Sequence, residues 1–313
     1  MKVIAPIQLV TANLISSTVA EPTTTAAGDA VGTTVWSAAV TYAAGARVVR
    51  AETHRVYESV AGSNLNNVPE STLSTTPPKW IDLGNTNRWR ALRTNANKPA
   101  VGASPMVFHV APGKRVSAVA VSGVIADSVK IEQYDSSSTL VQTIVDNLSS
   151  RVTLNWYDYF YGEFGARSAV LQQGLHPISG GSVKLTFTRG AGDVEVGPIV
   201  FGTPIDLGSM AKGSNVGVTD FSRIDRDAFG NAILIARKAV PKTTQKTLIP
   251  AAQTRLIEET LTAMRATVAL FIGIEDPLAA YFESLFVLGI ARDWSISMDE
   301  PNLAYLSLEI EGL

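Results

Sequence analysis

The stretch from Trp36 to Trp89 constrains the fold of this chain more than any other stretch. It holds three of the chain's five tryptophans, including Trp80. Short segments rich in valine and tyrosine alternate here with glycine and asparagine, which is typical of a small antiparallel sheet. Such a sheet buries too little aliphatic surface to be stable unless large rings fill its core. We therefore predict a compact β module whose core is closed by Trp36 and Trp80.

The aromatic residues and glycines of this module follow a recognisable order. Trp36 is followed by Tyr42, by Gly45 ahead of a valine-rich segment, by a second tyrosine segment at Tyr57 and, after a loop with asparagine and proline, by Trp80. In this order the module resembles the small chitin-binding type of carbohydrate-binding module found in bacterial chitinases. The resemblance implies exposed rings that stack on sugars.

One position departs from that family. The chitin-binding modules usually carry an exposed aromatic pair just after the second tyrosine strand, whereas this chain has Ser59-Val-Ala-Gly62 there. Sugar binding needs flat rings presented to solvent. The departure favours a scaffold role, in which Trp36, Tyr42 and Trp80 pack inside the module. The other interpretation, that these rings face a ligand, stays open.

Features spread from residue 1 to residue 313 resemble a tail-tip or baseplate protein of tailed bacteriophages. They are the segments Met1–Pro6, Pro77–Trp89, Trp156–Phe160 and Ser307–Leu313. The resemblance implies a structural protein of the viral tail, assembled in the host cytoplasm, that binds copies of itself and other tail or baseplate proteins. The alternative function is binding of a host-surface glycan or receptor through the Trp-rich module.

The pattern of the sequence divides the chain into four segments. Residues 1–33 are predicted as an N-terminal arm and linker, because Pro6 interrupts a weakly alternating run that indicates an edge strand or an extended arm. Residues 34–92 are the Trp-rich module. Residues 93–205 contain short alternating runs with Gly, Pro and Asp turns, which predicts a β-sandwich. With an α+β unit at 206–313, the predicted fold is mainly β and multidomain.

A run of aromatic side chains, Trp156 to Tyr161, lies within the predicted sandwich. Successive side chains of a strand point to opposite faces of a sheet. We therefore expect half of these rings in the core and half on a surface that binds a partner. Together with the rings of the Trp-rich module, the candidate residues for contact with a glycan or a protein partner are Trp36, Tyr42, Tyr57, Trp80, Trp89, Tyr157 and Tyr159.

Residues 206–313 combine strand patterns with one helix. Gly230 and Asn231 lie between two strand-like segments and predict a hairpin. Pro250 occupies the place of a first helical residue, and an apolar helical face follows it. This face consists of Leu256, Ile257, Leu261 and Met264. In the order of its elements alone, this unit resembles the domain that forms trimeric or hexameric rings in phage tail tubes and distal tail proteins. The resemblance implies a ring-like homo-oligomer.

Composition limits the classes of function. Only 17% of the residues are charged and 46% are hydrophobic, which favours a protein that buries surface against neighbours. The net charge is −2 and no run of Lys or Arg occurs, so we predict no nucleic-acid partner. No apolar run reaches the length of a membrane span, so we predict no membrane insertion. The absence of cysteine excludes disulfides and thiolate chemistry.

The residues that carry catalysis in other proteins form no pattern here. His54, His109 and His176 are scattered, and none has a second histidine or an acidic cluster at the spacing of a metal site. No nucleophile elbow and no phosphate-binding loop is present. We therefore predict a non-enzymatic protein with no catalytic residues, no metal site and no cofactor.

Overall fold

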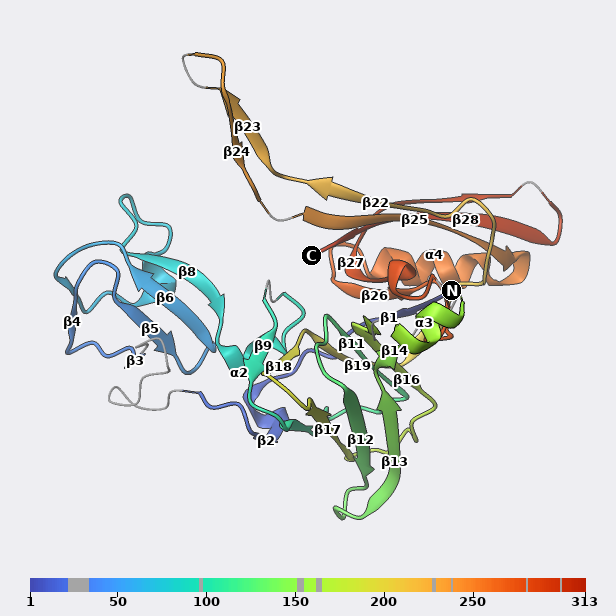
Figure 1. The fold of residues 1–313 in the computed structure, drawn as a ribbon, viewed down its shortest axis with the longest axis horizontal. Helices are drawn as coiled ribbons and strands as arrows, with labels where there is room; N and C mark the ends of the chain where they lie inside the picture. Colours follow the sequence, from blue (N-terminus) through green and yellow to red (C-terminus); the bar gives the residue numbers. More distant parts are fainter. Residues whose placement is uncertain are drawn as a thin grey trace.

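The computed structural model of this chain describes residues 1–21, 34–95, 98–150, 155–161, 165–226, 229–237, 239–279, 281–298 and 300–313. Strands dominate these residues and are arranged in several sheets, and the longest helix, α4, has ten residues. This confirms the predicted mainly β, multidomain fold (Figure 1). The expected linker at 22–33 lies outside the described residues.

The Trp-rich module is a small sheet with its own core. Its strands in sheet order are β3 (Thr34–Val35), β5 (Arg47–Arg50), β6 (Arg55–Ser59) and β8 (Trp80–Asn85). A ribbon of β4 (Thr41–Tyr42) and β7 (Asn64–Leu65) and the single turn α1 (Pro69–Thr72) complete it. The buried core consists of Tyr42, Val48, Tyr57 and Trp80. As predicted, large rings supply most of this core.

The middle of the chain forms two sheets that share a core. The order of the larger sheet is β13 (Leu140–Asn147), β12 (Ser128–Tyr134), β17 (Ser182–Thr188), β10 (Met106–Val110) and β2 (Leu14–Ser17). The order of the smaller sheet is β16 (Ala169–Gln173), β11 (Ala118–Ser122) and β19 (Ile199–Gly202). Alternating side chains such as Phe108, Val119, Ile131 and Phe187 fill the space between them.

Short elements surround this sandwich. A ribbon of β9 (Ala100–Gly102) and β18 (Val194–Val196) lies beside it, and a 3-10 turn at Thr11–Asn13 precedes β2. The one-turn helix α2 (Asn87–Arg90) leads from the Trp-rich module into it. A second ribbon, of β14 (Ser149–Ser150) and β15 (Gly165–Ala166), flanks the chain segment that contains helix α3 (Trp156–Tyr161).

The C-terminal part is an eight-stranded antiparallel sheet with helix α4 (Thr254–Ala263) on one face. The main path of the sheet runs through β20 (Pro204–Asp206), β1 (Lys2–Ile4), β26 (Ala269–Ile272), β27 (Phe286–Ser297), β28 (Leu303–Gly312), β25 (Ala239–Pro250) and β21 (Ser209–Met210), and β22 (Asn215–Asp220) also pairs with β25. The core under α4 includes Ile257 and Leu261 from the helix and Leu306 and Leu308 from β28.

Two predictions about this helix are wrong. Pro250 is the last residue of β25, and the 3-10 turn Ala251–Gln253 separates it from α4. Leu256 is largely exposed, whereas Ile257, Leu261 and Met264 pack inside as predicted. The buried stripe of α4 is therefore narrower than the apolar pattern indicated.

The N-terminal residues join two sheets. β1 lies between β20 and β26 within the C-terminal sheet, so it is not the edge strand that Pro6 suggested. A few residues later β2 pairs with β10 at the edge of the sandwich. The N-terminal segment therefore connects the sandwich to the C-terminal sheet.

The sandwich and the C-terminal sheet also share buried surface. Val119 and Val121 of β11 point into the sandwich core, whereas Ala118 and Ala120 of the same strand pack with Leu270 and its neighbours from the C-terminal part. Because alternate residues of one strand face opposite sides, the sheet β16-β11-β19 is covered on both faces. Small side chains at 118 and 120 allow this close approach.

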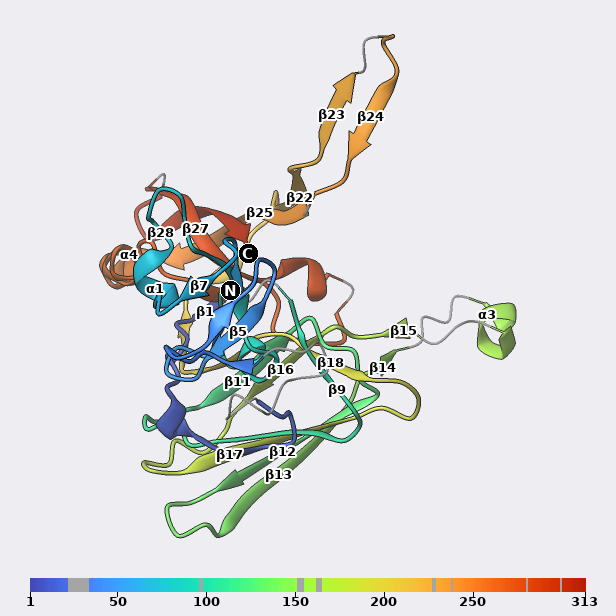
Figure 2. The same ribbon diagram turned by 90° about the vertical axis from the view of Figure 1, so that its left-hand side faces the viewer.

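A long arm leaves the C-terminal sheet. It follows β22 and consists of the hairpin of β23 (Arg223–Arg226) and β24 (Ala232–Ile235), which returns to β25. This confirms the hairpin predicted around Gly230. Figures 1 and 2 both show β23 and β24 extending away from the body of the molecule.

Candidate functional site

The rings of the Trp-rich module lie inside it. Trp80 and Tyr57 are each 1% exposed, and Tyr42 meets Trp80 edge to face with ring centroids 5.4 Å apart. Trp80 Nε1 donates a hydrogen bond to the carbonyl of Asn67 (2.9 Å), and the Tyr42 hydroxyl accepts one from the Ser37 amide (2.7 Å). These three rings are core residues, so their place among the candidate contact residues is corrected.

The remaining surface of the module carries one partly exposed tryptophan. Trp36 is half-buried, and the guanidinium of Arg50 lies 4.8 Å from its ring centroid. At the position where the chitin-binding family has exposed rings, Ser59 is buried and donates a hydrogen bond to the Ala61 carbonyl (3.0 Å). This segment forms a turn rather than a ring platform.

Trp89 belongs to a different core from the other module rings. It is fully buried among the apolar residues of the sandwich, and the ring of His54 stacks on it with centroids 4.0 Å apart. His54 lies between β5 and β6 of the Trp-rich module, so this stack joins the two units. The candidate contact role of Trp89 is likewise corrected, because the ring is closed off from solvent.

A buried carboxylate completes this junction. Oε1 of Glu21 accepts hydrogen bonds from the Thr86 hydroxyl (2.6 Å) and from Nδ1 of His54 (3.1 Å), and Arg88 lies 3.7 Å from its other oxygen. A carboxylate only accepts, so Nδ1 of His54 carries a proton, and Nε2 lies 2.7 Å from the hydroxyl oxygen of Thr11. We name these residues, with Trp89, the junction cluster.

The charge of Glu21 is stabilised within the junction cluster. Burial by itself raises the pKa of the Glu21 carboxyl, but the hydrogen bonds from His54 and Thr86 and the nearby Arg88 outweigh it, so the pKa lies below its ordinary value. Sequence analysis missed this cluster. Glu21 is 33 residues from His54, and no local spacing connects them.

The aromatic run at 156–161 is not a strand. It forms helix α3, and Figure 2 shows this helix at the far end of a projection beyond β14 and β15. Five of its rings are between 54% and 78% exposed, namely Trp156, Tyr157, Tyr159, Phe160 and Tyr161. The expectation of rings divided between core and surface is wrong, because no strand geometry sorts these side chains onto two faces.

The rings of α3 pack on one another. Trp156 stacks on Phe160 with centroids 6.2 Å apart, and Tyr157 lies 5.2 Å from Tyr161. Residues three and four apart on a helix are neighbours, which explains these pairs. The result is an exposed knob of rings with polar tips. Of the seven candidate contact residues, Tyr157 and Tyr159 are the two that reach solvent most fully.

The arm is a second exposed apolar feature. Its large side chains with at least 41% exposure are Phe221, Ile224, Phe229, Ile233, Leu234 and Ile235. Ile224 and Leu234 are paired across the hairpin on one face, and Ile233 and Ile235 lie on the other. Both faces of this ribbon therefore present apolar surface to solvent.

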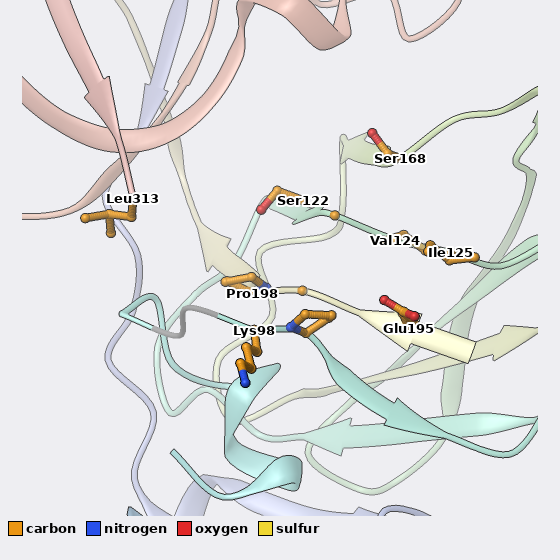
Figure 3. Close-up of a pocket in the computed structure, with 11 residues that line it drawn as sticks. Lys98, Ser122, Val124, Ile125, Ser168, Glu195, Pro198 and Leu313 are labelled. Atoms are coloured by element: carbon orange, nitrogen blue, oxygen red, sulfur yellow. The ribbon is translucent and has the colours of Figure 1, made fainter. Parts of the chain in front are cut away.

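A hollow of about 450 Å³ lies between the sandwich and the last residue of the chain (Figure 3). Pro198, Val124 and Leu313 give it apolar walls, and Lys98 and Glu195 add one charge of each sign. Ser122 and Ser168 also line it, but none of the chain's three histidines does. The hollow therefore offers an apolar surface without a serine and a histidine base side by side.

Within the ranges described above, no three His, Cys, Asp or Glu side chains lie close enough together to hold a metal ion. Over the same ranges, every helix is too short or too polar to cross a bilayer. Comparison of the chain with protein-family models, with curated proteins and with solved structures found no match.

Proposed function

We propose that this chain is a structural component of the tail tip or baseplate of a tailed bacteriophage, where it forms a ring-like homo-oligomer, a trimer or hexamer, through residues 206–313 and contacts other tail proteins. The observation that carries the proposal is the arm. An isolated two-stranded ribbon is at best marginally stable in water, and this one exposes apolar residues on both faces. A neighbouring chain that covers it would stabilise it.

The surface of the chain supports assembly in two further ways. The knob of rings on α3 is a second apolar projection, well away from the arm in Figure 2, so two different neighbours can be contacted at once. The low charged fraction of 17% also suits a chain that buries surface against copies of itself and other components. Large exposed apolar patches mark interaction sites in soluble proteins.

The alternative, binding of a bacterial surface glycan through the Trp-rich module, has less support. Sugar stacking requires exposed ring faces, and Tyr42, Tyr57 and Trp80 are buried. Trp36 is the one candidate ring of that module that is partly exposed, and Arg50 lies against it.

The test removes the arm without disturbing the sheet. Asp220 and Ala239 are paired at the point where the arm leaves the body, so an Asn-Gly turn that replaces residues 221–238 closes β22 directly onto β25. We expect the wild-type chain to form a defined oligomer by size exclusion with light scattering, and the shortened chain to be monomeric with the same melting temperature. A wild-type chain that stays monomeric at high concentration contradicts the proposal.

A further inference from the structure

We propose that the tip of the arm, through the side chain of Phe229, docks into an apolar groove beside the start of β22 of a second copy of this chain. This inference rests on the proposed homo-oligomer and specifies the contact that closes it. The contact is head to tail, because the arm and the groove are different surfaces. If each copy is rotated by the same angle relative to the previous one and the last copy meets the first, this contact generates a closed ring.

The groove lies beside the start of β22, the strand that leads into the arm. It has a volume of about 360 Å³ and is lined mainly by apolar side chains. These are Met210, Ala211, Val216, Ile274, Tyr281 and Leu285, and Ser284 lies among them. A second hollow of about 660 Å³ shares Met210 and Ala211 with the groove, but its other lining includes Lys212, Lys246 and four serines, so it is the poorer fit for the ring of Phe229.

The ring of Phe229 matches this groove in chemistry and size. The side chain of Phe229 is 91% exposed, and the apolar pair Ile224 and Leu234 lies further along the hairpin, beyond the pair Arg226 and Ala232. A closed cavity of about 150 Å³ is enough to hold a benzene ring. The groove therefore has room for the ring of Phe229 and part of one aliphatic neighbour.

The arm cannot reach the groove of its own chain. Val216 lines the groove and Phe229 is 13 positions further along, so at about 3.3 Å per extended residue the tip lies up to roughly 40 Å away. Figures 1 and 2 both show the hairpin pointing away from the body. The occupant of the groove is therefore another copy, whose own groove receives the next arm.

The area involved suits an interface between copies. At roughly 150–250 Å² per ring, the exposed parts of Phe221 and Phe229 alone offer on the order of 200–350 Å². The four aliphatic side chains of the hairpin add to this. A stable interface buries about 800 Å² on each partner, so the arm supplies a substantial share of it.

The absence of cysteine in the chain makes a direct test available. In a Phe229→Cys, Ser284→Cys double variant, mild oxidation should link the tip of one copy to the groove of the next, because Ser284 lines the groove and not the second hollow. We expect a ladder of covalent oligomers on a non-reducing gel, ending at the size of the wild-type ring. The matched control pairs Phe229→Cys with Val145→Cys, an exposed position on β13, and should give no ladder.

Complementation provides the second test. Phe229→Asp in one variant and Ser284→Asp in another should each weaken association at least about tenfold, and the two introduced charges repel each other. In a mixture of the two, the groove variant supplies an intact tip and the Phe229→Asp variant supplies an intact groove. Heterodimers should therefore form, but rings should not. Melting temperatures equal to that of the wild type show that both variants are folded.

The outcomes separate this contact from the proposed function. A wild-type oligomer that is not linked by the 229–284 pair overturns this contact and leaves the homo-oligomer standing. Linkage of the Phe229→Cys single variant into dimers also overturns it, because tips would then meet tips. A wild-type chain that is monomeric at every concentration overturns the proposed function itself.

Discussion

His54 of the Trp-rich module lies flat against Trp89 of the sandwich core, with the ring planes only 15° apart. The module has a separate apolar core of its own, which contains no residue from the sandwich. Its attachment to the sandwich includes this ring stack, the hydrogen bonds of Glu21 and two hydrogen bonds between Asn87 and Val101. In contrast, the sandwich and the C-terminal sheet share a continuous apolar cluster. Substitutions in the core of the Trp-rich module should therefore destabilise that module alone, whereas substitutions in the shared cluster should destabilise both the sandwich and the C-terminal sheet.

Replacing His54 by Ala should loosen the junction. The substitution removes the stack on Trp89 and leaves the buried carboxylate of Glu21 without one of its donors, which typically costs about 1–3 kcal/mol. Urea denaturation should report a lower free energy of unfolding, and limited proteolysis should cut earlier between module and sandwich. His176→Ala is the control, because that side chain is exposed and should change stability by less than about 0.5 kcal/mol. Equal effects of the two substitutions would contradict the role of the junction cluster.

Stability should depend on pH through Glu21. The pKa of the Glu21 carboxyl is lower in the folded chain than its ordinary value of 4.5. Its contribution to the free energy of unfolding is therefore fully present at pH values above 4.5. The contribution is lost as the pH falls through the lowered folded pKa, because the unfolded chain then binds the proton more readily. The difference in unfolding free energy between wild type and Glu21→Gln should therefore shrink between pH 6 and strongly acidic pH, as measured by urea titrations at each pH. A difference that stays constant would contradict the prediction.

Trp80→Ala should unfold the Trp-rich module and spare the rest. Removing a fully buried ring from a core of four residues costs about 3–5 kcal/mol. Because the module core is separate, we expect a new low-temperature transition in calorimetry while the main transition is retained. Ile81→Ala on the same strand provides the control, since that side chain is half-exposed and its loss should leave one transition. A single transition shifted as a whole by Trp80→Ala would show that the units unfold together.

The rings of α3 should matter for assembly and not for folding. Changing Tyr157 and Tyr159 together to Ser should alter the free energy of unfolding by less than about 0.5 kcal/mol, because both side chains are exposed. Under the proposed function, co-purification with phage tail proteins should fall. Tyr57→Ser is the contrasting variant, because that ring is buried and its loss should be strongly destabilising. A large loss of stability on changing the α3 rings would show that they act as core residues.

Local patterns in the sequence predicted the parts of the fold that are local in origin. The hairpin at Gly230, the helix that buries Ile257 and Leu261, and the ring-filled core around Trp80 each follow from residues close together in the chain. Alternation, turn residues and helical period act over a few positions, so one sequence is enough to detect them.

The candidate contact residues were predicted less well. The sequence singled out seven rings, but it could not separate Trp89, which is fully buried, from Tyr157, which is 70% exposed. Aromatic side chains serve both in cores and at interfaces, so residue type alone does not decide between the two.

The sequence by itself determined that this chain is mainly β, that its smallest unit depends on large rings, and that a hairpin and one long helix lie near its end. Only the tertiary structure decided that β1 lies inside the C-terminal sheet, that Glu21 meets His54, and that the α3 rings stand apart from every core. The physical reason is that burial and strand pairing join residues far apart in the chain. The pairing of Lys2 with Asp206 and Ile272 is set by the packing of whole sheets, which no short pattern encodes.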